Sequence, residues 1–234
     1  MKPTIWVALD VSTKSEADKV LGAIWPHRHI KIGMELFYRL GPDYVRQLVR
    51  QDVAVFLDLK CHDIPRTVAK AAQAADDLGA ELLTVHVAGG IPMMAAAQQR
   101  ALRLDLVGVT VLTSLDDQEL ARVGIVGGVT PLVAASARAA RIAGIAGLVC
   151  SGQEVPLVRQ VWPGARLVVP GIRQSGQGPE DQRRVVSPLE AYRLGATDLV
   201  VGRAVVQQSD PAAALRRIQA ELQWTGEVGD DSDV

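Results

Sequence analysis

The sequence predicts an α/β fold, a single (β/α)8 TIM barrel. Eight short apolar runs rich in β-branched residues alternate with alanine-rich segments of helical periodicity along the 234 residues, an alternation typical of a parallel sheet. Eight such units in a chain of this length fit a sheet that closes on itself. An open doubly wound sheet is the alternative. It usually has fewer strands, and its glycine-rich fingerprint is missing from residues 8–12 after the first run.

Each strand candidate is an apolar run of a length usual for strands and short for helices. In chain order the strand candidates cover residues 4–9, 29–32, 54–59, 82–87, 106–111, 147–150, 167–169 and 199–201. The helix candidates cover residues 14–24, 44–50, 64–78, 92–102, 131–143, 188–194 and 211–223. Several of them begin at a proline, which suits the first turn because its missing N–H would have no helical partner there.

One domain accounts for nearly the whole chain, since no linker, low-complexity block or short-period repeat interrupts it. We expect residues 1–224 to form a catalytic barrel domain. Residues 225–234 contain three aspartates, one glutamate and two glycines. This composition predicts a flexible acidic C-terminal tail.

The composition excludes several classes of partner. Hydrophobic residues make up 48% and charged residues 22% of the chain, and the formal net charge is −1, which argues against general binding to nucleic acid or to a membrane surface. No apolar stretch approaches the ~20 residues that span a bilayer, and the N-terminus lacks a signal-peptide layout. Cys61 and Cys150 are too few for a disulfide framework and form no metal motif. We therefore expect a cytoplasmic protein.

Charged residues gather where the first three strand candidates end, which is the functional end of a barrel. Asp10 follows the first run, Lys31 lies in the second, Asp58 and Lys60 mark the end of the third, and Asp63 is in the next loop. Asp58 and Lys60 are two residues apart and so share a strand face. The pair is either a structural salt bridge or part of a catalytic array. The neighbouring charges favour the array, because burying several charges together is costly without a functional return.

Glycine and arginine follow the last two strand candidates, in residues 170–173 (Pro-Gly-Ile-Arg) and 202–204 (Gly-Arg-Ala). Loops at these places form the common phosphate site of such barrels. Glycine lets backbone amides approach phosphate oxygens, and arginine supplies a bidentate fork. The alternative is that these are ordinary loop glycines and solvated arginines. Because two such loops are present at the expected places, we favour the phosphate site.

Other polar residues are weaker candidates. Thr113 and Ser114 end the fifth run, where a hydroxyl could bind substrate or cap the next segment. His86 ends the fourth run, and Gln182 lies in a polar stretch. We interpret Cys61 as a packed thiol on the opposite strand face from Lys60 rather than as a nucleophile.

Residues 58–67 read Asp-Leu-Lys-Cys-His-Asp-Ile-Pro-Arg-Thr. This segment resembles the Asp-x-Lys-x-x-Asp-Ile-Pro-x-Thr signature of the orotidine 5'-monophosphate decarboxylases. The resemblance extends over most of the chain, with supporting pieces at residues 7–10, 31–33, 112–114, 170–173, 181–184 and 201–203. Cys61 and Arg66 depart from the family's usual larger apolar residue and asparagine, which affects loop packing but removes no charged group.

The resemblance implies catalytic roles for four residues. Lys60 would donate the proton to C6 of the pyrimidine, and Asp58 would face the substrate carboxylate. Lys31 would complete the charged array. Asp63, together with Thr67, would reach the site of a neighbouring subunit, so that a homodimer is part of the mechanism. The residues that the resemblance assigns to substrate binding are Asp10, Lys31, Asp58, Thr67, Thr113, Arg173, Gln182, Gly202 and Arg203.

The implied reaction is decarboxylation of orotidine 5'-monophosphate to uridine 5'-monophosphate and CO2, the last step of UMP biosynthesis de novo. No cofactor and no metal are expected. Sister enzymes of the barrel superfamily, such as 3-keto-gulonate 6-phosphate decarboxylase and hexulose phosphate synthase, share the Asp-x-Lys-x-x-Asp core but use a divalent metal. The Ile-Pro-x-Thr continuation favours the nucleotide enzyme. A non-catalytic nucleotide-binding relic should have lost one of the five charged residues, and all five are present.

Overall fold

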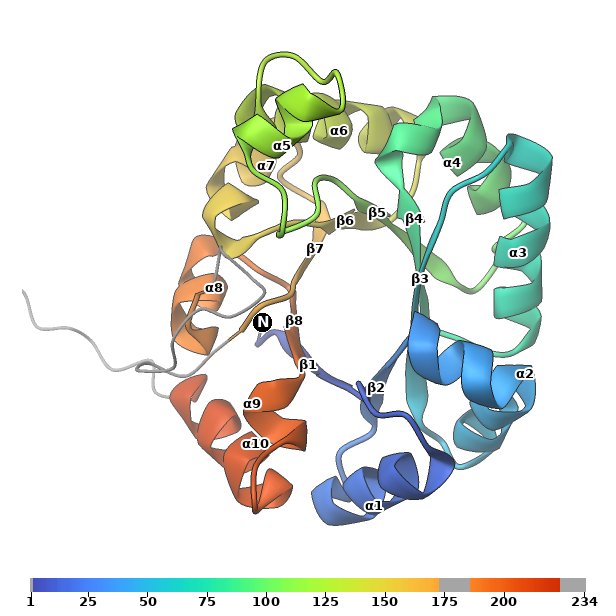
Figure 1. The fold of residues 1–234 in the computed structure, drawn as a ribbon, viewed down its shortest axis with the longest axis vertical. Coiled ribbons are helices and arrows are strands. Elements are labelled where there is room, and N and C mark those ends of the chain that lie inside the picture. Colours follow the sequence, from blue (N-terminus) through green and yellow to red (C-terminus); the bar gives the residue numbers. More distant parts are fainter. Residues whose placement is uncertain (1, 173–185, 224–234) are drawn as a thin grey trace, which may run out of the picture.

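Eight parallel strands close into a barrel in the computed structural model of the protein (Figure 1). The structure describes residues 2–172 and 186–223, so the predicted tail lies outside the described residues. Neighbouring strands follow chain order, and the last strand pairs with the first, which confirms the predicted barrel. The strands are β1 Thr4–Ala8, β2 His29–Gly33, β3 Ala54–Cys61, β4 Leu82–His86, β5 Asp105–Val109, β6 Gly147–Val149, β7 Arg166–Val169 and β8 Asp198–Val201.

Helices alternate with the strands and surround the barrel (Figure 1). The helices are α1 Lys14–Ile24, α2 Met34–Arg50, α3 Pro65–Asp77, α4 Gly90–Gln98, α5 Asp117–Arg122, α6 Val129–Ala143, α7 Val155–Val161, α8 Pro188–Leu194, α9 Arg203–Val206 and α10 Pro211–Glu221. Two 3-10 turns, η1 Val87–Gly89 and η2 Gly152–Glu154, precede α4 and α7. Proline lies in the first turn of α3, α7, α8 and α10, as such a residue should. None of the helices in the described part of the chain has the length and apolar character needed to cross a membrane.

Helix α2 is longer than the sequence predicts, since it begins at Met34 and not at residue 44. Gly41 has φ 68° and ψ −171°, which interrupts the helical conformation, and Pro42 follows it inside the helix. This Gly-Pro pair looks like a helix boundary in the sequence. Helices α5, α7 and α9, with six, seven and four residues, have no predicted counterpart.

The alternation of side chains along the strands builds two apolar cores. Inside the barrel lie Trp6, Ala8, Phe56, Leu82, Val107, Val168 and Val200. The outward-facing neighbours of these residues pack against the helices in a second, larger core, to which Val7, Leu57 and Leu83 belong. The inner core fills the middle of the barrel and leaves its two ends to polar side chains.

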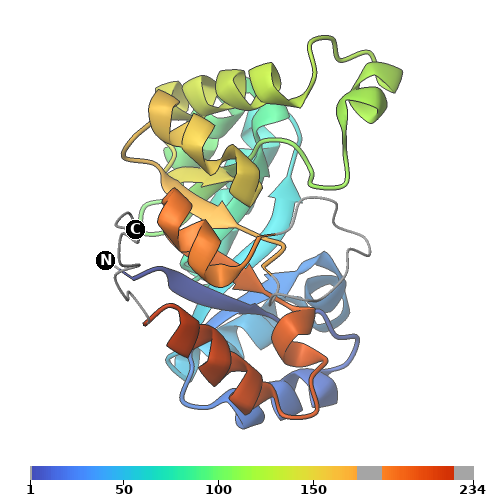
Figure 2. The ribbon, with the colours of Figure 1, turned by 90° about the vertical axis from the view of Figure 1, so that its left-hand side faces the viewer.

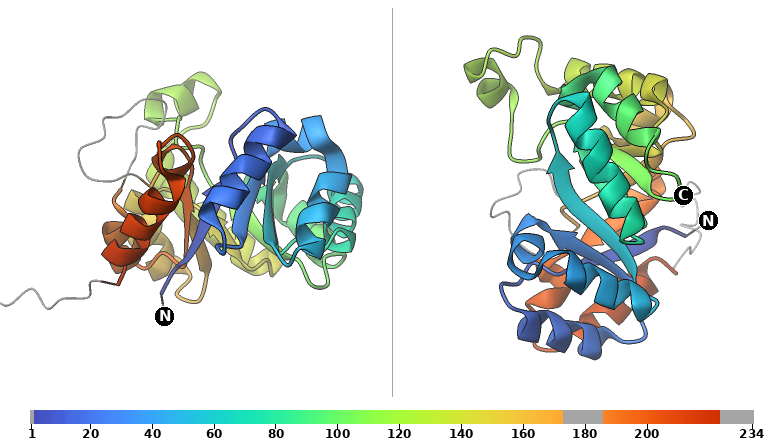
Figure 3. Two further views of the ribbon diagram at one scale, coloured as in Figure 1. Left: turned by 90° about the horizontal axis from the view of Figure 1, so that it is seen from below. Right: turned by 90° about the vertical axis from the view of Figure 1, so that its right-hand side faces the viewer.

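The two ends of the barrel face opposite sides of the molecule. Helix α5 and the segments that flank it project on the side where the strands end, whereas the N-terminus lies on the other side (Figure 2 and Figure 3). Active sites of such barrels lie at the carboxyl ends of the strands. Residues at the amino-terminal end of the barrel are therefore expected to stabilise the fold.

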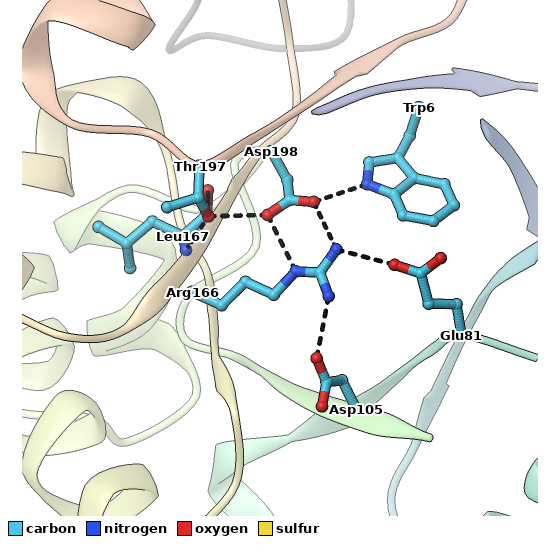
Figure 4. Close-up of polar contacts among 7 residues, drawn as sticks. All are labelled: Trp6, Glu81, Asp105, Arg166, Leu167, Thr197 and Asp198. Atoms are coloured by element: carbon cyan, nitrogen blue, oxygen red, sulfur yellow. Dashed lines mark hydrogen bonds and ion pairs between the residues drawn. The ribbon is translucent and has the colours of Figure 1, made fainter. Parts of the chain in front are cut away.

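Arg166, at the start of β7, binds three carboxylates at the amino-terminal end of the barrel (Figure 4). It donates two bonds to Asp198, with Nε–Oδ2 at 3.0 Å and Nη2–Oδ1 at 2.8 Å, one to Asp105 at 2.9 Å and one to Glu81 at 3.3 Å. The indole of Trp6 donates a further bond of 2.8 Å to Asp198, whose side chain is only 2% exposed. A buried carboxylate is tolerated only when it is paired in this way.

We expect Arg166→Met to lower the free energy of unfolding by about 3–5 kcal/mol, because it leaves Asp198 buried without its cationic partner. Urea unfolding at neutral pH measures the change. Arg138→Met, on the exposed side of α6, is the matched control and should change the free energy by less than about 0.5 kcal/mol. Similar losses in the two variants would contradict the assignment.

Candidate active site

A cavity of about 530 Å³ opens at the carboxyl ends of the strands. The predicted site residues that line it are Asp10, Lys31, Asp58, Lys60, Thr113, Gly202 and Arg203. They come from β2 and β3 and from the segments after β1, β5 and β8. Arg173 and Gln182 lie outside the described residues. Closure of the barrel thus brings together seven predicted residues from five separate segments of the sequence.

Four charged side chains form an array of alternating sign on one side of the cavity. The Nζ atom of Lys31 lies 3.4 Å from Oδ1 of Asp10 and 3.3 Å from Oδ2 of Asp58. The Nζ atom of Lys60 donates a bond of 2.8 Å to Oδ1 of Asp58. Each ammonium therefore has a carboxylate beside it, and Asp58 is shared between both lysines. The prediction that Asp58 and Lys60 share a face is confirmed.

Strand β3 is irregular where it carries this pair. Leu57 and Cys61 are four residues apart on β3 but pair with residues only two apart on β4. Three residues of β3 consequently face one residue of β4, Thr84. Lys60 has φ 49°, in the left-handed region that residues with a side chain seldom adopt. Such a conformation is held by the surrounding structure and occurs often at functional sites.

Burial and charge act in opposite directions on the array. Burial lowers the pKa of Lys31, but the charges of Asp58 and then Asp10 outweigh it, so that the pKa is raised overall. Burial raises the pKa of Asp58, whereas Lys31 and Lys60 lower it more strongly, and the net shift is downward. Asp58 and Lys31 are therefore both ionised near neutral pH, although the Lys31 side chain is only 10% exposed.

The floor and walls of the cavity beside the array are apolar. Phe56, Val109, Val149, Val168 and Val200 line the cavity from the inner faces of the strands. Charges fixed against such surroundings act more strongly on a bound molecule than they would in water. The site thus offers an oriented electrostatic field next to an apolar surface that suits a flat ring.

Gly202 and Arg203, at the junction of β8 and α9, line the cavity next to the Asp10 end of the array, because β8 pairs with β1. A Cβ atom on Gly202 would lie 3.1 Å from Oδ2 of Asp10, closer than nearly all real contacts of this kind, so a larger residue would push the carboxylate away. Gly171, with φ 75°, also lines the cavity after β7. These loops follow the seventh and eighth strands, as predicted for an anion site.

Asp63 and Thr67 are exposed and do not line the cavity of their own chain. Asp63 lies in the loop after β3, where its Oδ1 accepts a bond of 2.6 Å from the N–H of Ile64. Thr67 is in the first turn of α3. A single chain therefore does not bring these two residues to the other predicted site residues.

His86 and Cys61 lie next to the array. The ring of His86 is 5.4 Å from that of His62, and its pKa is lowered first by burial and then by the nearby charges of His62 and Lys60. Cys61 packs against the outer core, and burial raises the pKa of its thiol. This agrees with the interpretation of Cys61 as a packed thiol. Within the described residues, no group of three or more His, Cys, Asp or Glu side chains could hold a metal ion.

Three further polar residues belong to the site and are not predicted from the sequence. Gln207 and Gln208, after α9, line the cavity, and no pattern in the sequence separates them from surface glutamines. Thr84 is buried and hydrogen-bonds both Asp58 and the backbone of Lys60. Its position two residues before His86 marks it as a polar residue on the same strand face, but its contacts with β3 depend on the pairing of the two strands.

Comparison with known proteins agrees with this geometry. Residues 3–218 match the model of the "Orotidine 5'-phosphate decarboxylase / HUMPS family". A protein of Anaeromyxobacter dehalogenans named orotidine 5'-phosphate decarboxylase is 48% identical, over 95% of this chain and 100% of its own length. One of the same name from Nitrosococcus oceani is 44% identical, over 94% and 98%.

A solved structure shows the same architecture. The crystal structure of orotidine 5'-phosphate decarboxylase from Lactobacillus acidophilus superposes with a TM-score of 0.85 at 33% identity, covering 95% of this chain and 99% of that one. The family model, the relatives along their full length and the charged array at the mouth of the barrel agree. The chain belongs to the orotidine 5'-phosphate decarboxylase/HUMPS family.

Proposed function

We propose that the protein decarboxylates orotidine 5'-monophosphate to uridine 5'-monophosphate and CO2, the last step of UMP synthesis de novo, without a cofactor. The observation that carries this proposal is the alternating array of Asp10, Lys31, Asp58 and Lys60 beside an apolar surface in the cavity. The names of the full-length relatives support the same substrate.

The reaction requires electrostatic stabilisation of the negative charge that develops on C6 of the pyrimidine. When the bond between C6 and the carboxylate breaks, its electron pair remains on C6 in the plane of the ring, where the π system cannot delocalise it. The Lys60 ammonium stabilises this pair and then transfers a proton from Nζ to C6, which gives the product and neutral lysine. The bond of 2.8 Å to Asp58 holds that ammonium in the cavity.

The other members of the array orient the substrate. Asp58 lies beside the position of the departing carboxylate and favours its loss by repulsion. Lys31 and Asp10 bind the ribose hydroxyls, with Lys31 fixed between two carboxylates. Thr113, which lines the cavity after β5, contacts the base.

The phosphate binds at Gly202 and Arg203, together with Arg173 and Gln182. Gly202 carries no side chain that would press on the Asp10 carboxylate, and Arg203 lines the same part of the cavity. Binding energy from this remote group orders the site around the reacting carbon.

A homodimer completes the site, with Asp63 and Thr67 reaching into the neighbouring chain. Both are exposed and lie outside the cavity of their own chain. Apolar side chains are exposed on α2 and α4, the helices on either side of α3 in Figure 1, and just before α3, namely Met34, Tyr38, Ile64 and Ile91. An exposed apolar surface of this kind is typical of a protein–protein interface.

The first test is the loss of orotidine monophosphate absorbance in the presence of a chelator. We expect conversion by the wild type and a fall in kcat of at least about 10³-fold in Lys60→Ala, which loses both the proton donor and the stabilising charge. Lys70→Ala, an exposed lysine of α3, is the control and should retain full activity. A folded wild type that converts nothing until magnesium is added would instead indicate a metal-dependent sugar-phosphate enzyme.

The phosphate assignment predicts different effects of Arg203→Ala on two substrates. Turnover of orotidine monophosphate should fall by about 10²-fold or more, whereas turnover of orotidine, which lacks the phosphate, should hardly change. Arg216→Ala, on the exposed side of α10, is the control. Equal losses on both substrates would show that Arg203 supports the fold and not the phosphate.

The dimer predicts that two inactive variants restore activity when mixed. After unfolding and refolding Lys60→Ala and Asp63→Ala together, half of the dimers are hybrids, and each hybrid has one site with both residues intact. The mixture should therefore recover about a quarter of the wild-type activity. Recovery no greater than the sum of the separate variants would place Asp63 in the site of its own chain.

A further inference from the structure

Thr84 lies in β4, opposite the irregular part of β3. Its side chain is on the inner face of the barrel and only 1% of the residue is exposed. Because three residues of β3 face it, the regular ladder between the two strands is interrupted at this height. A backbone N–H inside such a gap needs another acceptor, since an unpaired buried N–H costs free energy.

The Thr84 hydroxyl fills this gap and has a defined direction. The backbone N–H of Lys60 donates to its Oγ1 at 2.7 Å, and Oγ1 lies 3.1 Å from Oδ1 of Asp58. An ionised carboxylate can only accept a hydrogen bond, so the single hydroxyl proton is donated to Asp58. The hydroxyl is thus an acceptor toward one residue of the array and a donor toward the other.

These contacts close a ring through Lys60. Its backbone is bound to Thr84, Thr84 to Asp58, and Asp58 to its own ammonium at 2.8 Å. The ring fixes both the left-handed backbone of Lys60 and the rotation of the carboxylate, so that Oδ1 faces Lys60 while Oδ2 faces Lys31.

We infer that Thr84 is a positioning residue for the proposed decarboxylation, since it sets where the Lys60 ammonium stands relative to the reacting carbon. This inference rests on the proposed function. It assigns Thr84 no contact with substrate and no proton in the reaction. A small displacement of a reacting group lowers the rate of the chemical step far more than it lowers the affinity for substrate. Loss of the Thr84 hydroxyl should therefore lower kcat and leave KM nearly unchanged.

The kinetic test compares Thr84→Val, which keeps the shape and removes the hydroxyl, with Thr84→Ser, which keeps the hydroxyl. We expect Thr84→Val to lower kcat by about 10–100-fold and to change KM by less than about threefold. Thr84→Ser should stay within about threefold of wild type in both constants. If Thr84→Val does not fold, Thr84→Ala replaces it as the variant without the hydroxyl.

Thr197→Val is the matched control, because it removes a threonine hydroxyl that bonds Asp198 at the opposite end of the barrel. It should lower stability and leave kcat unchanged. Wild-type kcat in Thr84→Val, a loss confined to KM, or equal losses in the valine and serine variants would each overturn the inference.

A second readout does not depend on the reaction. In amide hydrogen exchange, the Lys60 N–H should be protected in the wild type and in Thr84→Ser, and should exchange at least about tenfold faster in Thr84→Val. The 15Nζ resonance of Lys60 should shift in the same variant. If the wild type does not convert orotidine monophosphate, the proposed function is wrong. The exchange rate and the resonance of Lys60 still test the hydrogen bonds among Thr84, Asp58 and Lys60 in that case. Unchanged signals in Thr84→Val would overturn the positioning role even in an active decarboxylase.

Discussion

Asp58 holds two ammonium groups and one hydroxyl with a single carboxylate. Its Oδ1 accepts bonds from Lys60 and Thr84, and its Oδ2 lies beside Lys31. Two neighbouring cations in a cavity with apolar walls would otherwise repel each other and lose the water that solvates them. Asp58 is the one side chain that both lysines contact, so the field that a substrate would meet depends on its orientation.

The apolar interior of the barrel separates the charged array around Asp58 from the polar cluster around Arg166. The inner faces of the strands are polar at both ends and apolar between, with Arg166 and Asp198 at one end and Lys31 and Asp58 at the other. Residues such as Phe56 and Leu82 fill the space between them. Salt bridges at the amino-terminal end thus close the barrel, whereas those at the carboxyl end line a cavity and leave room for a ligand.

Much of this arrangement could be predicted from the sequence, and the exceptions have physical causes. The strands and the array are predictable because a short apolar run and the position at its end are local signals. The first half of α2 is not predicted, whereas the break that Gly41 and Pro42 signal is present, because the helical conformation is interrupted at Gly41. The role of Thr84 was missed because it depends on a shift in pairing between β3 and β4, which no single segment encodes.

The irregular pairing of β3 also limits how this part of the chain can vary. Asp58 and Lys60 face the cavity, whereas Leu59 and Cys61 face the helices, and the shift relative to β4 is absorbed within these four residues. Losing one residue here would turn the thiol of Cys61 toward the cavity in place of the ammonium of Lys60. The outward-facing positions can therefore change in identity without moving the array, whereas a change in the length of the segment would displace Asp58 or Lys60 from it.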